Sequence, residues 1–465
     1  MSQGWMVHLA LMVGVAALAL LTTVSQTAAL AAAGGLVLCA GAARHLEKLP
    51  KLGLLIVIAL VPLSYLGTRV ALGFLNSLTK LFFLPSLAFL IGERVLSRRP
   101  WVLGRMGLYA ALFGGTLAAS YLVNDSTPYS LWLLSRFAGV LLLYFLSANA
   151  LRTEEDLRHL LGVVAASCLL SAAGALWVRP PAPTNGLLGA TVRMTGWSVE
   201  DAPTFGTNLL VALLICVYGM AAARRTWLRL ALIPAAGVLL LGIVLTYARG
   251  VSVATAITLA ILLFRLRRRV PAGALLAAGA LILAGGAFLV PDAYWERMTT
   301  MFTQAATDPT ISRRWTSYRI GWQLFQRRPL LGFGPGNFLA QYMAPEFRFD
   351  RTSVPSVLFN LYLSVTAQAG LLGLAAFGLL TWQAFRELRF VRRSLSQADA
   401  ALRQSAEVLE LILVALLLIS LFEPTDLQKY LWMAFGAAAA VGHLRRQQVA
   451  GVPAASQESG CRFPC

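Results

Sequence analysis

The chain has 465 residues, of which 58% are hydrophobic and 13% are charged. Soluble globular domains carry about 25% charged residues, so this composition excludes an ordinary water-soluble protein. The 39 Lys and Arg residues outnumber the 20 Asp and Glu residues and give a formal net charge of +19. Much of a chain with this composition must lie in lipid.

Apolar runs long enough to cross a bilayer recur along the whole sequence. A spanning helix needs about 20 apolar residues, because hydrocarbon offers no partner for unpaired backbone groups. Fourteen runs qualify, and three of them are short, so we expect an all-α polytopic membrane protein with about 12–14 transmembrane helices. We interpret the first run as a retained span, because no charged flank precedes it and no clear cleavage site follows. The runs lie near residues 5–22, 27–43, 52–67, 71–92, 101–123, 129–149, 160–178, 203–222, 227–247, 250–264, 270–290, 357–380, 407–421 and 428–444.

The basic residues gather in alternate loops of this fourteen-span arrangement. Seven such segments hold 22 of the 39 Lys and Arg residues. Loops rich in Lys and Arg stay in the cytoplasm, so we expect both termini to be cytoplasmic. Contact with anionic lipid headgroups then accounts for the basic excess, and we expect no nucleic-acid partner. The segments are 44–51, 93–100, 150–159, 223–228, 265–269, 381–406 and the tail from 444.

Two segments on the opposite, outer side are longer than the others, and long structured loops are usually functional. They cover residues 179–201 and the 66 residues 291–356, of which the second holds eight Arg and no Lys. Within it, aromatic residues in 312–328 recur at spacings of 3, 4 and 3, which predicts one face of a helix. We expect a large outer loop whose helices lie along the membrane surface.

A glycine-rich run, 330–338 (LLGFGPGNF), follows this predicted helix and Pro329. Three alternating glycines permit a tight turn that another group can approach closely. The run is either a simple turn that leads back into the membrane or a backbone that approaches a phosphate. The glycines alone do not decide between these two interpretations.

Four basic residues lie in or beside the predicted spans, where charge is costly and usually functional. Lys80 and Arg136 lie within spans, Arg249 begins one, and Arg193 lies in the first outer segment. They predict a cationic pocket at the outer leaflet, with snorkelling or ion pairing between helices as the alternative. Guanidinium groups bind phosphate oxygens bidentately, so such a pocket suits a diphosphate.

The histidines do not form a metal-binding pattern. They are scattered in spans or on the predicted cytoplasmic side, and none lies in the outer loops. We therefore expect no metal and no cofactor, because arginines can stabilise a diphosphate leaving group by themselves. The four are His8, His45, His159 and His443.

Several short motifs on the outer side occur in a fixed order. They are Arg193-Met194-Thr195-Gly196, Asp201-Ala202-Pro203 with Asn208, Thr246-Tyr247-Ala248-Arg249-Gly250, the segment from Arg313 through the glycine-rich run, Asn360-Leu361-Tyr362-Leu363, Gly370-Leu371-Leu372-Gly373 and Lys429-Tyr430-Leu431-Trp432. Together they resemble the O-antigen ligase and polymerase superfamily over roughly residues 150–440. Each motif is weak alone, and their order and placement carry the resemblance.

The resemblance implies a metal-independent membrane glycosyltransferase in the bacterial inner membrane. It would take a glycan from undecaprenyl diphosphate on the periplasmic side and join it to a sugar or lipid-linked acceptor, with membrane lipids around it. By position, the resemblance implies that Arg193 and Arg249 hold the diphosphate. We predict Arg193, Arg249, Asp201 and Glu346 as catalytic residues. We predict Arg193, Arg249, Arg136, Arg313 and Arg314 as diphosphate-binding residues. The implied acceptor side comprises Gly334, Gly336, Asn337 and Asn360.

One position departs from the family. Ligases of the superfamily usually carry a histidine just before the asparagine that opens the span after the large loop, and here Phe359 precedes Asn360. Either a carboxylate accepts the proton, or positioning suffices, or the chain is an inactive or repurposed homologue. The departure favours a polymerase slightly over a ligase that attaches the glycan to the lipid A core. The candidate carboxylates are Glu200, Asp201, Glu346 and Asp350.

Two other classes of function are open. A transporter of lipid-linked glycan would also place cations in the membrane, but it predicts charges along a path between the two faces. A non-catalytic envelope assembly protein is the other class. In domain terms we expect N-terminal transmembrane helices (1–150), a ligase- or polymerase-like domain (151–445) containing the periplasmic loop, and a disordered cytoplasmic tail (446–465).

Overall fold

A computed structural model describes residues 48–64, 78–124, 127–177, 193–197, 201–223, 225–267, 273, 290–303, 309–347, 357–394 and 400–451. In these residues the chain forms fourteen α-helices and no β-strand, which confirms the all-α prediction. The helices are α3 (Leu49–Ala59), α5 (Leu78–Ser97), α6 (Gly104–Val123), α7 (Pro128–Ala150), α8 (Glu154–Trp177), α9 (Ala202–Ala222), α10 (Thr226–Leu245), α11 (Arg249–Leu266), α13 (Asp292–Thr303), α14 (Pro309–Arg327), α15 (Phe338–Tyr342), α16 (Leu361–Ser394), α17 (Ala400–Ile419) and α18 (Lys429–Val449). Two short 3-10 turns, Pro345–Phe347 and Thr425–Leu427, complete the elements.

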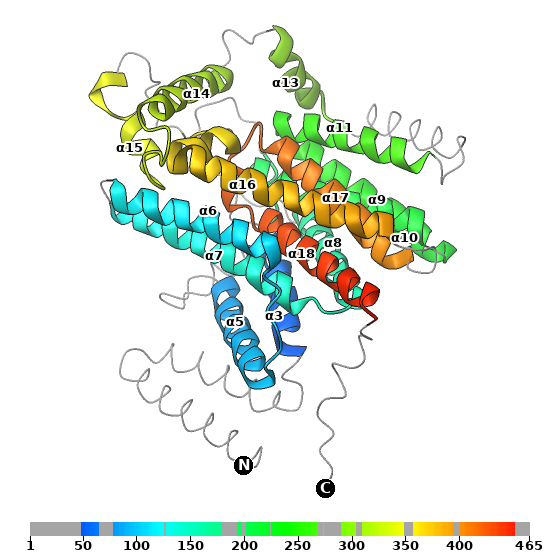
Figure 1. Cartoon of the computed structure of the whole chain (residues 1–465). Coiled ribbons are helices and arrows are strands. Elements are labelled where there is room, and N and C mark those ends of the chain that lie inside the picture. The colour runs from blue at the N-terminus through cyan, green and yellow to red at the C-terminus, as the bar shows by residue number, and fades with distance from the viewer. Residues whose placement is uncertain are drawn as a thin grey trace, which may run out of the picture.

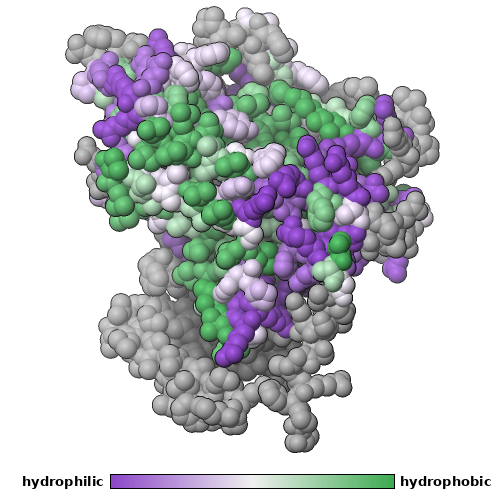
Figure 2. Space-filling model, viewed as in Figure 1, coloured by the Kyte–Doolittle hydropathy of each residue, from purple (hydrophilic) through white to green (hydrophobic). Residues whose placement is uncertain are grey.

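Seven of the described helices are long and apolar enough to cross a membrane: α6 to α11 and α16. Their bounds agree with the predicted spans to within a few residues at most ends, and α16 extends well beyond its span. Figure 2 shows a hydrophobic band across this face, with hydrophilic residues over α14 on one side and around the ends of α5, α16 and α18 on the other. The protein is therefore a polytopic membrane protein. The predicted spans near 5–22 and 27–43, most of 270–290 and the tail from 452 lie outside the described residues.

Helix α18 lies at the centre of the bundle. Its residues from Tyr430 to Gly442 are buried, and Trp432 is the largest fully buried side chain. It packs against α7, α16 and α17, and α16 packs in turn against α6 (Figure 1). Helices from the predicted N-terminal unit thus share one bundle with those of the second unit, and the division near residue 150 stays a prediction.

Helix α16 is broken at Gly370, where the backbone has φ +65° and ψ −162°. The break leaves backbone groups without helical partners, and the glycine-rich run supplies them. Phe333 N–H donates to the Ala367 carbonyl at 2.8 Å, and Leu372 N–H donates to the Leu330 carbonyl at 3.3 Å. The glycine-rich run therefore completes the backbone of a broken membrane helix.

Helices α13, α14 and α15 lie together at one end of the bundle (Figure 1). The helix predicted over 312–328 is α14, but its aromatic residues do not share one environment. Trp315 and Trp322 are exposed, whereas Tyr318 and Phe325 are half-buried. The reason is that the helix buries its Ile320 face, which turns two of the four rings partly inward. Its position along the membrane surface stays a prediction.

Candidate functional site

The corner between α10 and α11 holds a strained residue. Tyr247 has φ +52°, in the left-handed region, which costs a residue with a side chain about 1–2 kcal/mol. Its ring is buried beside Tyr294 of α13, and its carbonyl accepts a hydrogen bond from Arg297 Nε at 2.9 Å. These contacts stabilise the strained conformation of Tyr247. The turn at Tyr247 determines where α11 begins, and the first residue of α11 is Arg249.

Arg249 is tied back to α13 by a reciprocal contact. Its Nε donates to the Arg297 carbonyl at 3.0 Å, while Arg297 Nε donates to the carbonyl of Tyr247. The two arginines therefore link α11 and α13 through backbone acceptors. Neither of these two hydrogen bonds involves a carboxylate.

Arg193 reaches the same corner from the segment 193–197. The next residue, Met194, donates its N–H to the Leu245 carbonyl at 2.9 Å, at the end of α10. Burial lowers the pKa of Arg193, and the positive charge of Arg249 lowers it further, while Asp201 and Glu423 act in the opposite direction. Within the described part of the chain, Arg193 makes no hydrogen bond or ion pair. Its guanidinium is partly buried, and its N–H groups have no acceptor among the described residues.

The turn after α17 closes the other side of the corner. A side-chain carbon on Gly250 would lie 2.7 Å from the Cβ of Phe422, so this turn packs directly on α11. Arg314 of α14 donates to the Phe422 carbonyl and to Glu423 Oε1, the latter at 2.7 Å. Burial raises the pKa of Glu423, although Arg314 opposes this shift.

Phe359 supports the two adjacent arginines of α14. Its ring centroid lies 4.5 Å from the guanidinium carbon of Arg314 and 5.3 Å from that of Arg313. Tyr318 of the same helix donates its hydroxyl to the Phe359 carbonyl at 2.8 Å. Asn360 then caps α16, because its Oδ1 accepts the Leu363 N–H at 2.9 Å.

Among the described residues, these contacts define an arginine cluster at one end of the bundle, in which five arginines outnumber two carboxylates. Burial and mutual repulsion both disfavour several positive charges at close range. A bound anion with several oxygens would offset this cost, because its oxygens accept hydrogen bonds from the guanidinium groups. The arrangement can therefore grip a diphosphate and keep carboxylates beside it. Its members are Arg193, Arg249, Arg297, Arg313 and Arg314 with Asp201 and Glu423.

A comparison with protein families adds an independent finding. The family model described as O-antigen ligase matches residues 234–378. This segment resembles an O-antigen ligase domain. The predicted resemblance to the O-antigen ligase and polymerase superfamily is thereby confirmed over these residues. The match indicates a glycosyltransferase-type enzyme of this general function. No curated protein matches the chain.

The matched O-antigen ligase domain runs from α10 into α16, so it contains Arg249, Arg313 and Phe359. Arg193 and Glu423 lie outside the matched residues, yet the fold brings both to the cluster. The family model therefore covers only part of the candidate site.

Two predicted site residues lie elsewhere. Arg136 is exposed on α7, with its guanidinium carbon 4.9 Å from the centroid of Trp132. Glu346 is exposed and forms an ion pair with Arg327, at 2.5 Å, at the far end of α14 from the cluster. Fourteen helical residues separate Arg313 from Arg327, which corresponds to roughly 20 Å. The structure thus brings neither Arg136 nor Glu346 to the cluster.

The remaining predicted residues are one cation and two carboxylates. Lys80 is exposed on α5. Glu200 and Asp350, two candidate proton acceptors, lie outside the described residues.

The glycine-rich run lies within the segment that matches the O-antigen ligase family. Its polar groups form hydrogen bonds with neighbouring helices. Gly334 N–H donates to the Gln368 carbonyl at 3.1 Å, and Asn337 Oδ1 accepts from Ser130 Oγ at 2.6 Å. A Cβ on Gly336 would lie 3.2 Å from the Cα of Ser130. The close approach predicted for these glycines occurs, but the approaching groups belong to α7 and α16. Their assignment to the acceptor side stays a prediction.

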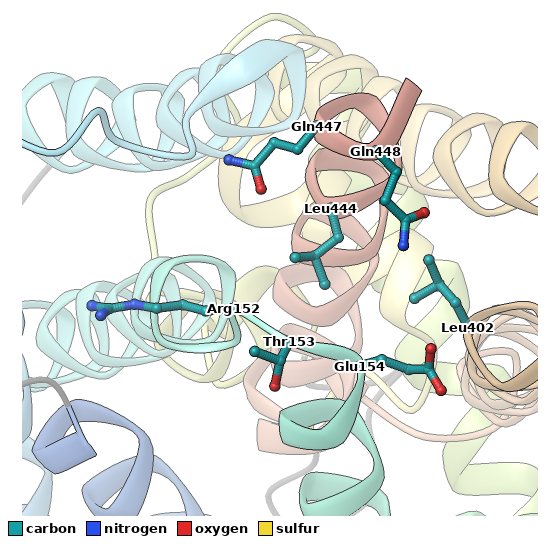
Figure 3. A pocket seen from close by; sticks show the side chains of 7 residues that line it. All are labelled: Arg152, Thr153, Glu154, Leu402, Leu444, Gln447 and Gln448. Atoms are coloured by element: carbon teal, nitrogen blue, oxygen red, sulfur yellow. The ribbon is translucent and has the colours of Figure 1, made fainter. Parts of the chain in front are cut away.

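A hollow lies at the end of α17 opposite the arginine cluster. It has a volume of about 210 Å³ and is lined by Arg152, Thr153, Glu154, Leu402, Leu444, Gln447 and Gln448 (Figure 3). Leu402 is at the start of α17, whereas Glu423 follows its end, so about 30 Å of helix separates this hollow from the cluster. Among the described residues, no group of three His, Cys, Asp or Glu side chains is placed to hold a metal ion.

Sequence reasoning missed two members of the cluster, Glu423 and Arg297. Glu423 follows the apolar run 407–421, so the rule that charges at span ends are functional could have identified it. Arg297 was recognised only as one of eight outer arginines. Its contact with the corner depends on how α13 folds back, which spacing does not reveal.

Proposed function

We propose that this protein transfers a glycan from undecaprenyl diphosphate to a sugar acceptor on the periplasmic side of the bacterial inner membrane, during polymerisation or ligation of a surface polysaccharide. The observation that supports this most is the convergence of Arg193, Arg249, Arg313 and Arg314 at one end of the bundle. A diphosphate headgroup offers several anionic oxygens to such a set, and its polyprenyl tail fits the surrounding lipid.

In the proposed reaction, an acceptor hydroxyl oxygen attacks the anomeric carbon of the first sugar on the carrier. The bond from that carbon to the phosphate oxygen breaks, and undecaprenyl diphosphate leaves with the bonding electron pair. Negative charge therefore grows on the diphosphate, where arginines already in place stabilise it more in the transition state than in the bound substrate. Arg193 and Arg313 suit this role best, because neither donates a hydrogen bond to another described residue.

The acceptor hydroxyl must also lose a proton. Glu423 and Asp201 are the carboxylates of the cluster, and Asp201 Oδ1 caps α9 by accepting the Thr204 N–H at 3.0 Å. Glu423 suits proton acceptance better, because burial raises its pKa and so makes its carboxylate a stronger base. We assign Glu423 the role that the missing family histidine would have filled.

Polymerase remains our preferred form of the reaction, since Phe359 stands where ligases of the superfamily carry a histidine. The alternative is a ligase, the activity named in the description of the matched family. A transporter would need charges along the whole path between the two faces, whereas the described arginines gather in one cluster. Adding a divalent metal or a chelator during transfer tests the proposed metal independence.

Transfer from a purified lipid carrier tests the proposal. The wild-type protein, reconstituted in nanodiscs with undecaprenyl-diphosphate-linked glycan and acceptor, should yield extended or ligated glycan and released undecaprenyl diphosphate. Arg193→Gln and Arg313→Gln should each lower the rate at least 100-fold, the size of loss seen for one oxyanion donor.

Arg136→Gln is the matched control, because Arg136 lies outside the cluster and its variant should keep the wild-type rate. If the wild type moves the lipid across the bilayer without forming product, the protein is a transporter. If both cluster variants transfer normally, the cluster is not the site.

A further inference from the structure

We propose that Phe359 is a positioning residue that holds the guanidinium group of Arg313 towards the diphosphate. The proposal rests on the proposed function, and it adds a residue without polar groups to the site. The ring lies within 5.3 Å of two guanidinium carbons, those of Arg313 and Arg314. Both distances are within the range at which the negative face of an aromatic ring attracts a cation.

The two arginines differ in what else holds them. Arg314 has polar acceptors in the turn after α17, the Phe422 carbonyl and Glu423. Arg313 donates no side-chain hydrogen bond within the described part of the chain, and its Nε is buried without a partner. The Phe359 ring is thus the contact that restrains the Arg313 guanidinium while leaving its two terminal N–H groups available to phosphate oxygens.

The backbone of Phe359 is fixed well enough to serve this purpose. Tyr318 donates its hydroxyl to the Phe359 carbonyl, and Leu361 N–H donates to the Ser420 carbonyl at 2.9 Å. On the other side, Leu358 is 3% exposed and packs against Gly321. A Cβ on Gly321 would lie only 2.7 Å from Cδ2 of Leu358, so the glycine leaves room for this side chain. A ring anchored on both sides can orient a flexible arginine side chain.

The Phe359 ring also offsets the electrostatic repulsion between Arg313 and Arg314. Arg313 and Arg314 are adjacent in α14, and each adds positive charge to the cluster. An aromatic face attracts both cations without neutralising either one, whereas a carboxylate in its place would pair with the charge that the diphosphate needs. A histidine at this position would become cationic on accepting a proton and would repel them.

The test compares Phe359→Leu, which removes the aromatic face, with Phe359→Tyr, which keeps it. Phe359→Leu should raise the KM for the lipid-linked donor and the Kd for inorganic pyrophosphate about tenfold each, as expected for losing two partly desolvated cation–π contacts. Phe359→Tyr should stay within about twofold of wild type in both measurements. Phe333→Leu is the matched control, because it removes a cation–π contact, with Arg328 at 5.0 Å, outside the cluster.

The outcomes separate this proposal from the proposed function. Wild-type transfer with unchanged KM and Kd in Phe359→Leu would overturn the role of the ring and leave the function standing. No wild-type transfer, but a Kd for pyrophosphate that depends on an aromatic residue at 359, would support the ring and overturn the function. A tenfold loss in Phe359→Tyr or in Phe333→Leu would overturn the ring's role by showing that the effect is one of general packing.

Discussion

Arginine alone supplies the basic charge of the segment 291–356, which we predict to be an outer loop, and the contacts of the cluster explain why lysine would not serve. Arg314 donates to two acceptors while its planar group lies over Phe359. Arg249 and Arg297 each donate through Nε, an atom that lysine lacks. These are uses of a flat, multi-donor cation that stays charged when partly buried.

Glu423 should impose a pH dependence on transfer. Its carboxylate must be deprotonated to accept a proton, and burial raises its pKa, so activity should fall on acidification at a higher pH than for an ordinary carboxyl of pKa about 4.3. Glu423→Gln keeps an oxygen for Arg314 but cannot accept the proton, and it should lower kcat about 100-fold or more. The pH–rate profile of the variant should lack the acidic limb.

Asp201→Asn is the control for this experiment, since an asparagine can still cap α9. It should retain the acidic limb. An unchanged rate and profile in Glu423→Gln would remove Glu423 from the mechanism.

Single site residues could be predicted where a motif in the sequence marks them, and not where their position depends on which way a helix faces. Arg249 and Arg193 were identified by their motifs, and the fold brings them within electrostatic range of each other. Arg136 was a plausible charge in a span, but its neighbour Phe137 faces the core at 1% exposure. Adjacent helical residues differ by about 100° in direction, so Arg136 points outward. Because a membrane helix has low amphipathicity, the sequence does not show in which direction Arg136 points.

At the scale of elements, α16 and the glycine-rich run form one unit. The run gives its N–H groups to carbonyls released by the break at Gly370, so these N–H groups are not available to a phosphate. Of the two interpretations open from the sequence, the structure supports the structural turn. Spacing predicted the close approach, but it could not show that the approaching element was α16, because that pairing joins segments separated along the chain.

Gly370→Ala should destabilise the protein more than a typical glycine substitution in a helix. The new Cβ would lie 2.2 Å from the carbonyl carbon of Leu330, on a residue with φ +65°. Strain and overpacking of this kind cost about 1–3 kcal/mol each, so the thermal unfolding temperature in detergent should fall by several degrees. Gly378→Ala, in the same helix with no described atom within 4 Å of its Cβ, should not lower it. Equal unfolding temperatures for the two variants would contradict the role of this contact.

At the scale of the whole molecule, composition and hydropathy predicted most of the architecture. Long apolar runs determine where helices cross the membrane, so α6, α7 and α9 match their predicted spans closely. The arrangement of those helices was not predictable, because nearly every face of a membrane helix is apolar and the pattern does not say which face meets protein. Helix α18 is an example: its burial comes from close packing of small residues such as Gly436, whose Cβ would lie 2.5 Å from the Tyr144 carbonyl oxygen.

The most direct test of the central claim is an electron cryo-microscopy structure of the protein in nanodiscs with undecaprenyl diphosphate bound. We expect the diphosphate oxygens within hydrogen-bonding distance of the guanidinium groups of Arg193 and Arg313, and the polyprenyl tail in the adjacent leaflet. A diphosphate bound at the other end of α17, beside Arg152, or Arg193 and Arg249 found far apart, would contradict the account.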